Sequence, residues 1–219
     1  PAEHSNRLHG GVAYAVAGLC LVYAIVLTVG LVTRPSPSHP IQDPWFTAME
    51  LLILGGGVFL GRALVEAAVQ AGHAVTVFNR GRSRDRWPIE VEPLVGDRRS
   101  SLAPLAGRRF DAVIDTCGYR PQDLELSCGL LADACQRYCF VSSISAYASL
   151  ARAPILESDA TAALAGHDTQ EVTGENYGPL KAECERVVMR HFGARSLLVR
   201  PGLIVGRDDP TGRFSYWVW

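Results

Sequence analysis

The stretch MELLILGGGVFLGRALVEAAVQAGHAVTVFNRGR, residues 49–82, has the clearest structural pattern in this chain. Its apolar run at 51–54 predicts a buried strand, and residues 59–72 carry the apolar spacing of an amphipathic helix. Three glycines stand between them, and a second apolar run at 74–79 predicts another strand. A strand that turns through glycines into a helix offers free backbone N–H groups to a pyrophosphate. The stretch therefore predicts the first unit of a dinucleotide-binding fold.

The rest of the chain continues this alternation of short apolar runs and amphipathic stretches. Further strands are expected at 90–96, 111–118, 138–143 and 196–202, with further helices near 122–136 and at 177–192. Strands that alternate with helices indicate a doubly wound parallel sheet. We therefore expect residues 49–219 to form an α/β domain.

Residues 11–33 lack any charged side chain over 23 positions. At about 1.5 Å per residue such a helix spans a bilayer core of about 30 Å, so a transmembrane helix is expected there. A buried core helix and a secretory signal peptide are the alternatives. A linker with four prolines follows at 34–44, and the domain would be membrane-anchored on the cytoplasmic side. Met49 would also be a natural first residue of the α/β domain. Residues 1–48 would then be a fused or misjoined segment, and the protein would be soluble and cytoplasmic.

The net charge and the cysteines narrow the classes of partner. The net charge is −1, so no nucleic acid or other polyanion is expected. The cysteines show no CxxC pair and no ligand-like spacing with histidine, so we expect reduced thiols and no metal site. They stand at positions 20, 117, 128, 135, 139 and 184. A small-molecule substrate is the expected partner, and a homodimer stays open.

The end of the second expected strand bears on the choice of cofactor. An acidic residue there would bind the ribose 2′-hydroxyl of NAD. This chain has Asn79 followed by Arg80 and Arg82, and a neutral amide beside guanidinium groups suits a 2′-phosphate. NADP(H) is therefore favoured over NAD(H), although these arginines could simply face solvent. Asp97, after the third strand, is placed to reach the adenine amino group.

Tyr177 and Lys181 are the expected catalytic pair. They lie four residues apart, so both project from one face of a helix. Pro179 is tolerated only in a first turn, which places Tyr177 at the start of that helix. A tyrosine with a pKa of about 10 is a poor base at neutral pH, and a nearby ammonium group favours its phenolate. Ser143, at the end of the fifth strand, could donate a hydrogen bond to a substrate oxygen.

Five motifs follow one another over the α/β domain: LLILGGGVFLG, DAVIDTCGY, FVSSISAY, YGPLK and LVRPGLIVG. Together they resemble the extended short-chain dehydrogenase/reductase family, in its NAD-dependent epimerase/dehydratase branch. The resemblance implies a Rossmann fold with Ser143, Tyr177 and Lys181 as the catalytic triad. Ser142 and Ser145 are the alternatives to Ser143 within the serine run.

The resemblance also implies a set of cofactor-binding residues. The glycines of the turn would hold the pyrophosphate, Cys117 and Gly118 would line the nicotinamide ribose, and Pro201 would lie near the carboxamide. The full expected set is Gly55, Gly56, Gly57, Phe59, Leu60, Gly61, Asn79, Arg80, Asp97, Cys117, Gly118, Lys181 and Pro201.

The chain departs from the family's pattern in three places. Val58 stands where the middle glycine is usual. The run DTCGY stands where many sugar-nucleotide epimerases carry His-x-Ala-Ala, which weakens a sugar-nucleotide assignment. The lobe that usually defines the substrate is largely absent after Trp219, so we expect the domain to be incomplete at its carboxyl end.

Two functions remain open. The first is an enzyme that transfers a hydride at a carbinol or keto carbon, with Tyr177 as acid/base, Lys181 on the ribose and Ser143 on the substrate oxygen. The second is a non-catalytic NAD(P)-binding sensor or RNA-associated protein on the same fold. The complete triad favours the enzyme, and the acidic side chains of residues 148–176 give no basic surface for RNA. That segment either covers the substrate entrance or is a solvated loop.

Overall fold

The computed structural model describes residues 48–82, 90–151, 153–164, 166 and 170–211. Within these residues the strands are β1 (Glu50–Leu54), β2 (Ala74–Asn79), β3 (Val91–Val95), β4 (Phe110–Asp115), β5 (Cys135–Val141) and β6 (Ser196–Val199). The α-helices are α2 (Phe59–Gln70), α3 (Pro121–Leu131) and α4 (Tyr177–Phe192). Short 3-10 helices form at η1 (Ala103–Leu105), η2 (Ile144–Ala146) and η3 (Gly193–Arg195).

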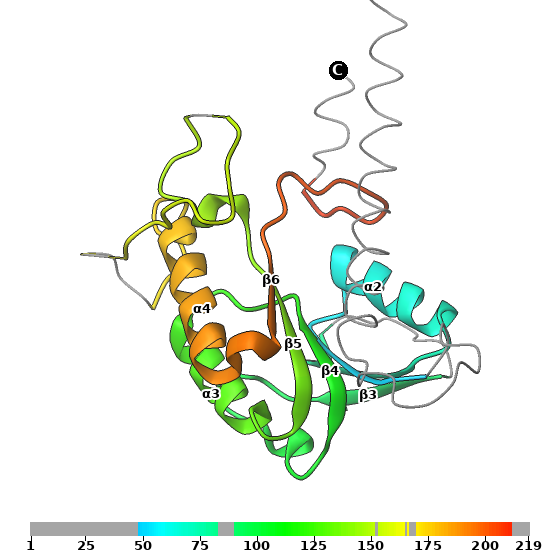
Figure 1. Cartoon of the computed structure of the whole chain (residues 1–219). Coiled ribbons are helices and arrows are strands. Elements are labelled where there is room, and N and C mark those ends of the chain that lie inside the picture. Colours follow the sequence, from blue (N-terminus) through cyan, green and yellow to red (C-terminus); the bar gives the residue numbers. More distant parts are fainter. Residues whose placement is uncertain (1–47, 83–89, 152, 165, 167–169, 212–219) are drawn as a thin grey trace, which may run out of the picture.

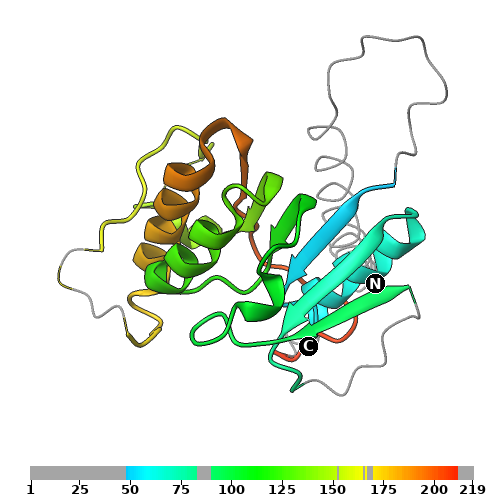
Figure 2. The same ribbon diagram turned by 90° about the horizontal axis from the view of Figure 1, so that it is seen from below.

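The strands form a sheet in the order β3-β2-β1-β4-β5-β6, and every pairing is parallel. The chain starts in the middle at β1, runs outward to β3, then crosses to β4 and runs outward to β6 (Figure 2). This order confirms the doubly wound parallel sheet. In such sheets ligands bind at the carboxyl ends of the strands where the order reverses. Here that point lies between β1 and β4.

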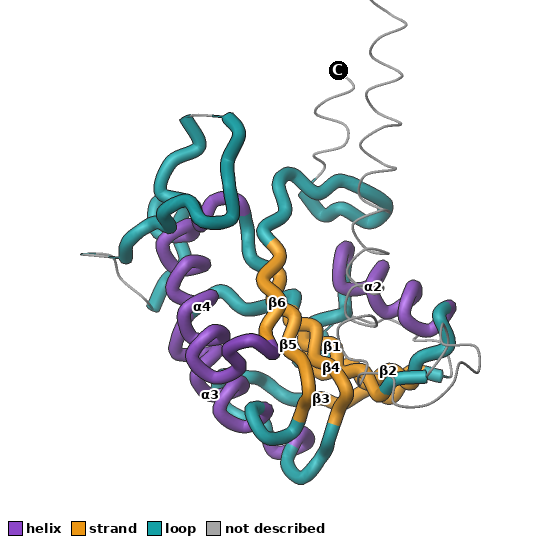
Figure 3. The backbone as a smooth tube through the Cα atoms, in the orientation of Figure 1, coloured by secondary structure: helices purple, strands orange, loops and turns teal. Residues whose placement is uncertain are grey.

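Different helices cover the two faces of the sheet (Figure 1, Figure 3). Helix α2 lies against one face, and α3 and α4 lie against the other. The side chains of β1 alternate between them, since Leu51 and Ile53 pack with α2 whereas Leu52 and Leu54 pack with the core beneath α3 and α4. We call these the α2 face and the α3/α4 face.

Prolines explain where two of the helices begin. Pro121 occupies the first turn of α3, where its missing N–H leaves no intrahelical bond unmade. Helix α4 begins at Tyr177, two residues before Pro179, which confirms the expected helix start. Just before it, Asn176 Oδ1 accepts a hydrogen bond from Thr173 N at 2.7 Å and so fixes the entry of the chain.

One helix is shorter than the sequence predicts. The helix expected near 122–136 ends at Leu131, and β5 begins at Cys135 instead of position 138. The reason is long-range, because Cys135 pairs with Phe110 at the start of β4 and so joins the sheet. Local apolar spacing does not report such a pairing.

The described cysteines, which are Cys117, Cys128, Cys135, Cys139 and Cys184, are free thiols. Burial raises the pKa of each to about 12. They therefore stay protonated at neutral pH and act as small apolar side chains.

In the part of the chain that the structure describes, no helix is long and apolar enough to cross a membrane. The expected transmembrane helix at 11–33 and the proline-rich linker at 34–44 lie outside the described residues.

Candidate functional site

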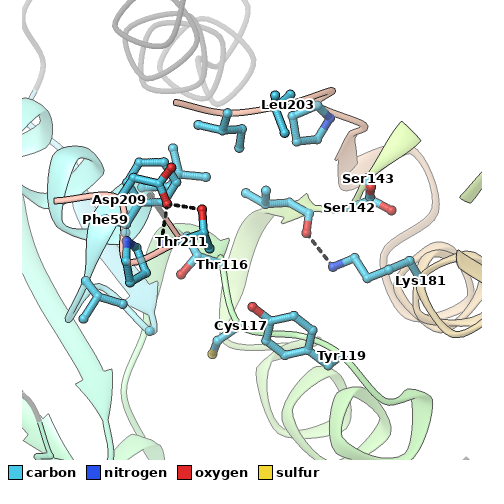
Figure 4. Close-up of a pocket in the computed structure, with 18 of the residues that line it drawn as sticks. Phe59, Thr116, Cys117, Tyr119, Ser142, Ser143, Lys181, Leu203, Asp209 and Thr211 are labelled. Atoms are coloured by element: carbon cyan, nitrogen blue, oxygen red, sulfur yellow. Dashed lines mark hydrogen bonds between the residues drawn. The ribbon is translucent and has the colours of Figure 1, made fainter. Parts of the chain in front are cut away.

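A cavity of about 730 Å³ opens at the carboxyl ends of β1, β4 and β5 (Figure 4). It is bordered by the glycine turn after β1, the residues after β4, the serine run after β5, the start of α4 and the segment after β6. Its lining includes Gly55, Gly56, Gly57, Phe59, Leu60, Gly61, Cys117, Ser143, Tyr177, Lys181 and Pro201. The cavity thus brings the expected pyrophosphate turn together with the three expected triad residues.

The glycine turn is closed tightly enough that side chains would not fit. Gly55 and Gly56 have φ angles of +103° and +72°, in the left-handed region that favours glycine. A Cβ at Gly56 would lie 2.9 Å from Val77 Cγ1, and a Cβ at Gly61 would lie 2.8 Å from Gly56 Cα. The absence of a side chain at Gly61 therefore lets the first turn of α2 lie against the glycine turn.

Val58 stands where the middle glycine is usual, but its side chain does not fill the turn. It precedes α2 with an extended backbone, and the residue is 64% exposed. No side chain caps the N-terminus of α2, which borders the cavity. The first N–H groups and the dipole of the helix therefore favour an anion at this end of the cavity.

The Lys181 amine is buried beside the cavity and is held by main-chain carbonyl groups. Its Nζ donates to Gly118 O at 2.8 Å and to Val141 O at 2.7 Å, and lies 4.1 Å from the ring centroid of Phe140. Burial lowers the pKa of Lys181 to about 8, so the ammonium form predominates at neutral pH. Gly118, which we expected to line the cofactor, instead anchors this amine and is not part of the cavity lining.

Gly178 brings the start of α4 against the loop that carries the serines. A Cβ at Gly178 would lie 2.2 Å from Ser145 O, so a larger residue could not make this approach. Ser143 Oγ accepts a hydrogen bond from Ser145 N at 3.1 Å, which leaves its own O–H free to donate. Ser143, Tyr177 and Lys181 consequently border the same cavity although they come from two separate elements.

The alternative serines line the same cavity but differ in their hydrogen bonding. Ser142 Oγ is buried and has no hydrogen-bond partner among the described residues. Ser143 Oγ is oriented by a backbone N–H, and a fixed hydroxyl suits the role of a donor to substrate. Ser142 and Ser143 thus differ in whether the main chain holds the hydroxyl oxygen, and the choice of Ser143 as the triad serine stays a prediction.

The three residues expected at the adenosine end of a cofactor are not part of the cavity lining. Asn79 Nδ2 donates to Gly55 O at 3.3 Å, and its Oδ1 accepts from Gly81 N at 2.8 Å. The amide thus braces the glycine turn. Arg80 is exposed, and Asp97 caps its own turn by accepting the backbone N–H two residues further on.

A buried ion pair between Arg98 and Asp115 anchors the chain after β4. The guanidinium donates to both carboxylate oxygens, at 3.0 and 2.8 Å, and Tyr138 OH donates to Asp115 Oδ2 at 2.8 Å. Burial by itself raises the pKa of Asp115, but Arg98 and the hydrogen bonds outweigh it, so the pKa is lowered and the group stays charged. Asp115 Oδ1 also accepts from Cys117 N at 3.0 Å, which fixes the first residues of the DTCGY run.

Sequence reasoning missed four residues around this run, which are Arg98, Asp115, Thr116 and Tyr119. Asp115 sits within an apolar strand, and a carboxylate there requires a partner, yet nothing local identifies Arg98 as that partner. Thr116 Oγ1 donates to Leu54 O at 2.9 Å and lines the cavity beside the glycine turn. Tyr119 also lines the cavity, and the available signal for it is its position at the end of the motif DAVIDTCGY.

Residues 201–211, red in Figure 1, run from the end of β6 towards α2 and complete the cavity. Arg207 Nη2 donates to Glu66 Oε2 at 2.9 Å and ties this segment to α2. Gly206 passes close to Phe59 at the start of that helix.

No protein-family model matches the chain. The chloroplast stem-loop binding protein of 41 kDa b from Arabidopsis thaliana is 30% identical to it over 127 residues, which are 51% of this chain and 33% of that protein. The chain thus spans about a third of the length of this curated relative.

Solved structures of NAD-dependent epimerases and dehydratases share the fold. The Bordetella bronchiseptica enzyme WbmG in complex with NAD superposes with a TM-score of 0.54 at 19% identity, covering 68% of this chain and 52% of that one. A UDP-galactose 4-epimerase superposes with a TM-score of 0.55 at 22% identity, covering 68% and 55%. The chain spans about half the length of these proteins. At such identities the likeness shows the fold, and it confirms the expected Rossmann architecture.

Proposed function

We propose that this domain binds a nicotinamide dinucleotide and forms the cofactor half of an NAD(P)-dependent oxidoreductase, epimerase or dehydratase of the extended short-chain dehydrogenase/reductase type. The observation that carries the proposal is the cavity that the glycine turn shares with Ser143, Tyr177 and Lys181. The fold likeness to WbmG, whose structure contains NAD, supports it. The coverage of about half of such enzymes leaves the substrate class open.

The glycine turn and the N-terminus of α2 would hold the pyrophosphate. The tight approach of Gly61 to Gly56 leaves the main chain of the turn bare, so that phosphate oxygens could reach its N–H groups. When bound, the nicotinamide ring supplies the hydride acceptor or donor.

The triad residues would handle the proton and the substrate oxygen. Tyr177 would give or take the proton at the reacting oxygen, and the fixed Ser143 O–H would donate to that oxygen. Lys181 uses two of its three protons on main-chain carbonyls and keeps the third for a ribose hydroxyl. Its charge also favours the phenolate form of a nearby tyrosine.

Substitution of Tyr177 in the complete protein tests this assignment. We expect Tyr177→Phe to bind NADPH as the wild type does, because the ring remains, and to lose about 10²–10⁴-fold in turnover of a substrate found by screening. Lys181→Ala should weaken both cofactor binding and turnover. If Tyr177→Phe turns over the substrate within a few-fold of the wild-type rate, Tyr177 is not the acid/base of a catalytic triad. A non-catalytic NAD(P)-binding protein would then be favoured.

We also propose that the cofactor is NADP(H) in preference to NAD(H). Asn79 carries no charge to repel a 2′-phosphate, and the exposed Arg80 follows it at the end of β2. Fluorescence titration should show tighter binding of NADPH than of NADH, and Arg80→Ala should reduce that preference by about tenfold. Arg109→Ala is the matched control, because Arg109 is also exposed but directly precedes β4, at the amino end of the strands and so opposite the carboxyl ends where the cavity opens. Equal affinities for NADPH and NADH would show that Arg80 faces solvent and does not contact the 2′-phosphate.

RNA binding is the second candidate function. The curated relative is named a stem-loop binding protein, and this name is the observation in its favour. The net charge of −1 gives no general attraction for a polyanion. A mobility shift with stem-loop RNA at physiological salt decides the matter: affinity tighter than the micromolar range of non-specific binding would put this candidate first.

For residues 11–33 we propose a membrane anchor, on the strength of their uncharged length. The whole chain should then sediment with membranes and resist carbonate washing, whereas a chain that starts at Met49 should not. Quantitative release by carbonate would contradict the anchor.

A further inference from the structure

Tyr119 stands on a stretch of main chain that is fixed from both sides. A Cβ at the preceding Gly118 would lie 2.7 Å from both Leu124 Cδ1 and Phe140 Cε2, so this backbone is packed against the α3/α4 face. The following Arg120 is 7% exposed, forms an ion pair with Asp123 and donates to the carbonyl of Gln170. The Tyr119 ring can therefore move only about its own side-chain bonds.

The ring of Tyr119 borders the catalytic end of the cavity. Lys181 Nζ lies 5.5 Å from the ring centroid, and the same Nζ donates to Gly118 O, the carbonyl immediately before Tyr119. Figure 4 shows the Tyr119 hydroxyl directed into the cavity at the end of the ring nearer Cys117, with the Lys181 amine over the ring. The residue is 47% exposed, and within the described ranges no hydrogen bond occupies its hydroxyl. It is thus a ring on a fixed main chain, with an open polar end.

The hydroxyl of Tyr119 is also suited to remain neutral. Burial raises the pKa of Tyr119, and the nearby Tyr177 raises it further. At neutral pH it therefore keeps its proton and can both donate and accept a hydrogen bond. Tyr119 and Tyr177 both line the cavity.

We infer that Tyr119 is a cofactor-contacting residue whose hydroxyl, together with the Lys181 amine, binds the ribose diol of the nicotinamide half. This rests on the proposed function. The pairing is chemically matched: Lys181 can offer its remaining N–H to one ribose oxygen, while Tyr119 can accept from, or donate to, a diol hydroxyl. Lys181 is thereby shared between main chain and ligand, and Tyr119 supplies the second point of contact that orients the sugar.

Three ligands of graded length test this assignment in the whole chain. NADPH contains both riboses and the nicotinamide ring, 2′-phospho-ADP-ribose lacks only the ring, and 2′-phospho-ADP also lacks the second ribose. Affinities are measured by calorimetry for the wild type, Tyr119→Phe and Tyr119→Ala. Binding of 2′-phospho-ADP reports that the adenosine end and the fold are intact in each variant.

The expected result is that Tyr119→Phe weakens NADPH and 2′-phospho-ADP-ribose alike, by about three- to tenfold for one lost hydrogen bond, and leaves 2′-phospho-ADP unchanged. Unchanged affinity for 2′-phospho-ADP-ribose would overturn the ribose contact. If, in addition, Tyr119→Ala weakens the binding of NADPH and Tyr119→Phe does not, the ring only covers the amine of Lys181. A wild-type chain that binds none of the three ligands and does not bind NADH either would overturn the proposed function, and this inference with it.

Discussion

The two faces of the sheet are built on different physical principles. On the α2 face, the core that packs β1 against α2 consists of apolar side chains such as Leu51, Ile53 and Leu64. The α3/α4 face encloses charges as well, since the Arg98–Asp115 pair is buried there and the Lys181 amine lies against Phe140.

The two faces also serve opposite ends of the cavity. The α2 face ends in the bare glycine turn, which presents main-chain groups only. The α3/α4 face ends in side chains that carry charge or a proton, and its buried ion pair holds the DTCGY run from which Tyr119 extends. Buried charge thus lies where side chains must be oriented, and the two faces should respond differently to substitution.

The largest effect is expected from Arg98→Met. Asp115 would then be left as a buried charge without its cation, which typically costs about 3–5 kcal/mol of unfolding free energy. Arg98→Met combined with Asp115→Asn should recover much of this loss, because the uncompensated charge is gone. Urea denaturation measures the unfolding free energy of both variants. If Arg98→Met alone lies within about 1 kcal/mol of the wild type, the ion pair does not have this role.

On the α2 face, Leu64→Ala should cost about 2–5 kcal/mol, because a fully buried side chain is replaced by a cavity. Here no partner substitution should rescue the protein, since the loss is one of volume. Urea denaturation of Leu64→Ala alone and combined with Asp115→Asn makes the comparison. Recovery in the double variant would show that the two faces are not independent.

The stability contributed by Lys181 should depend on pH in a defined window. Its pKa is about 8 in the folded state, lowered by burial from its ordinary 10.5. Between these values the unfolded chain holds a proton that the folded chain has released, so the unfolding free energy rises with pH. Relative to Lys181→Met, the wild type should gain about 3 kcal/mol across the window. If the difference in unfolding free energy between the wild type and Lys181→Met does not change with pH, the Lys181 amine is not buried in the folded state.

The smallest effect is expected from Arg207→Ala on the α2 side. Its pair with Glu66 resembles the Arg98 pair chemically, but the Arg207 side chain is 74% exposed. Exposed pairs contribute about 0–1 kcal/mol, and this variant should stay within that range in the same denaturation assay. A loss as large as that of Arg98→Met would show that burial does not separate the two pairs.

The parts of the site that could be predicted from the sequence are those encoded locally. The glycine turn follows its strand directly, and the spacing of Tyr177 and Lys181 with Pro179 defines a helix start, which the structure confirms. The supporting contacts could not be predicted in this way. Gly178 looks like an ordinary helix residue until Ser145 O is found beside it.

By itself, then, the sequence determined the alternation of strands and helices, because apolar periodicity depends only on neighbouring residues. It also predicted candidates for chemistry, such as Ser143, Tyr177 and Lys181, which the structure places around one cavity. Tertiary structure alone decided that Lys181 is held by Gly118 and Val141, and that Arg98 neutralises Asp115. The physical reason is that these partners are distant in the chain. Only the strand order, with β1 beside β4 and β4 beside β5, brings them together.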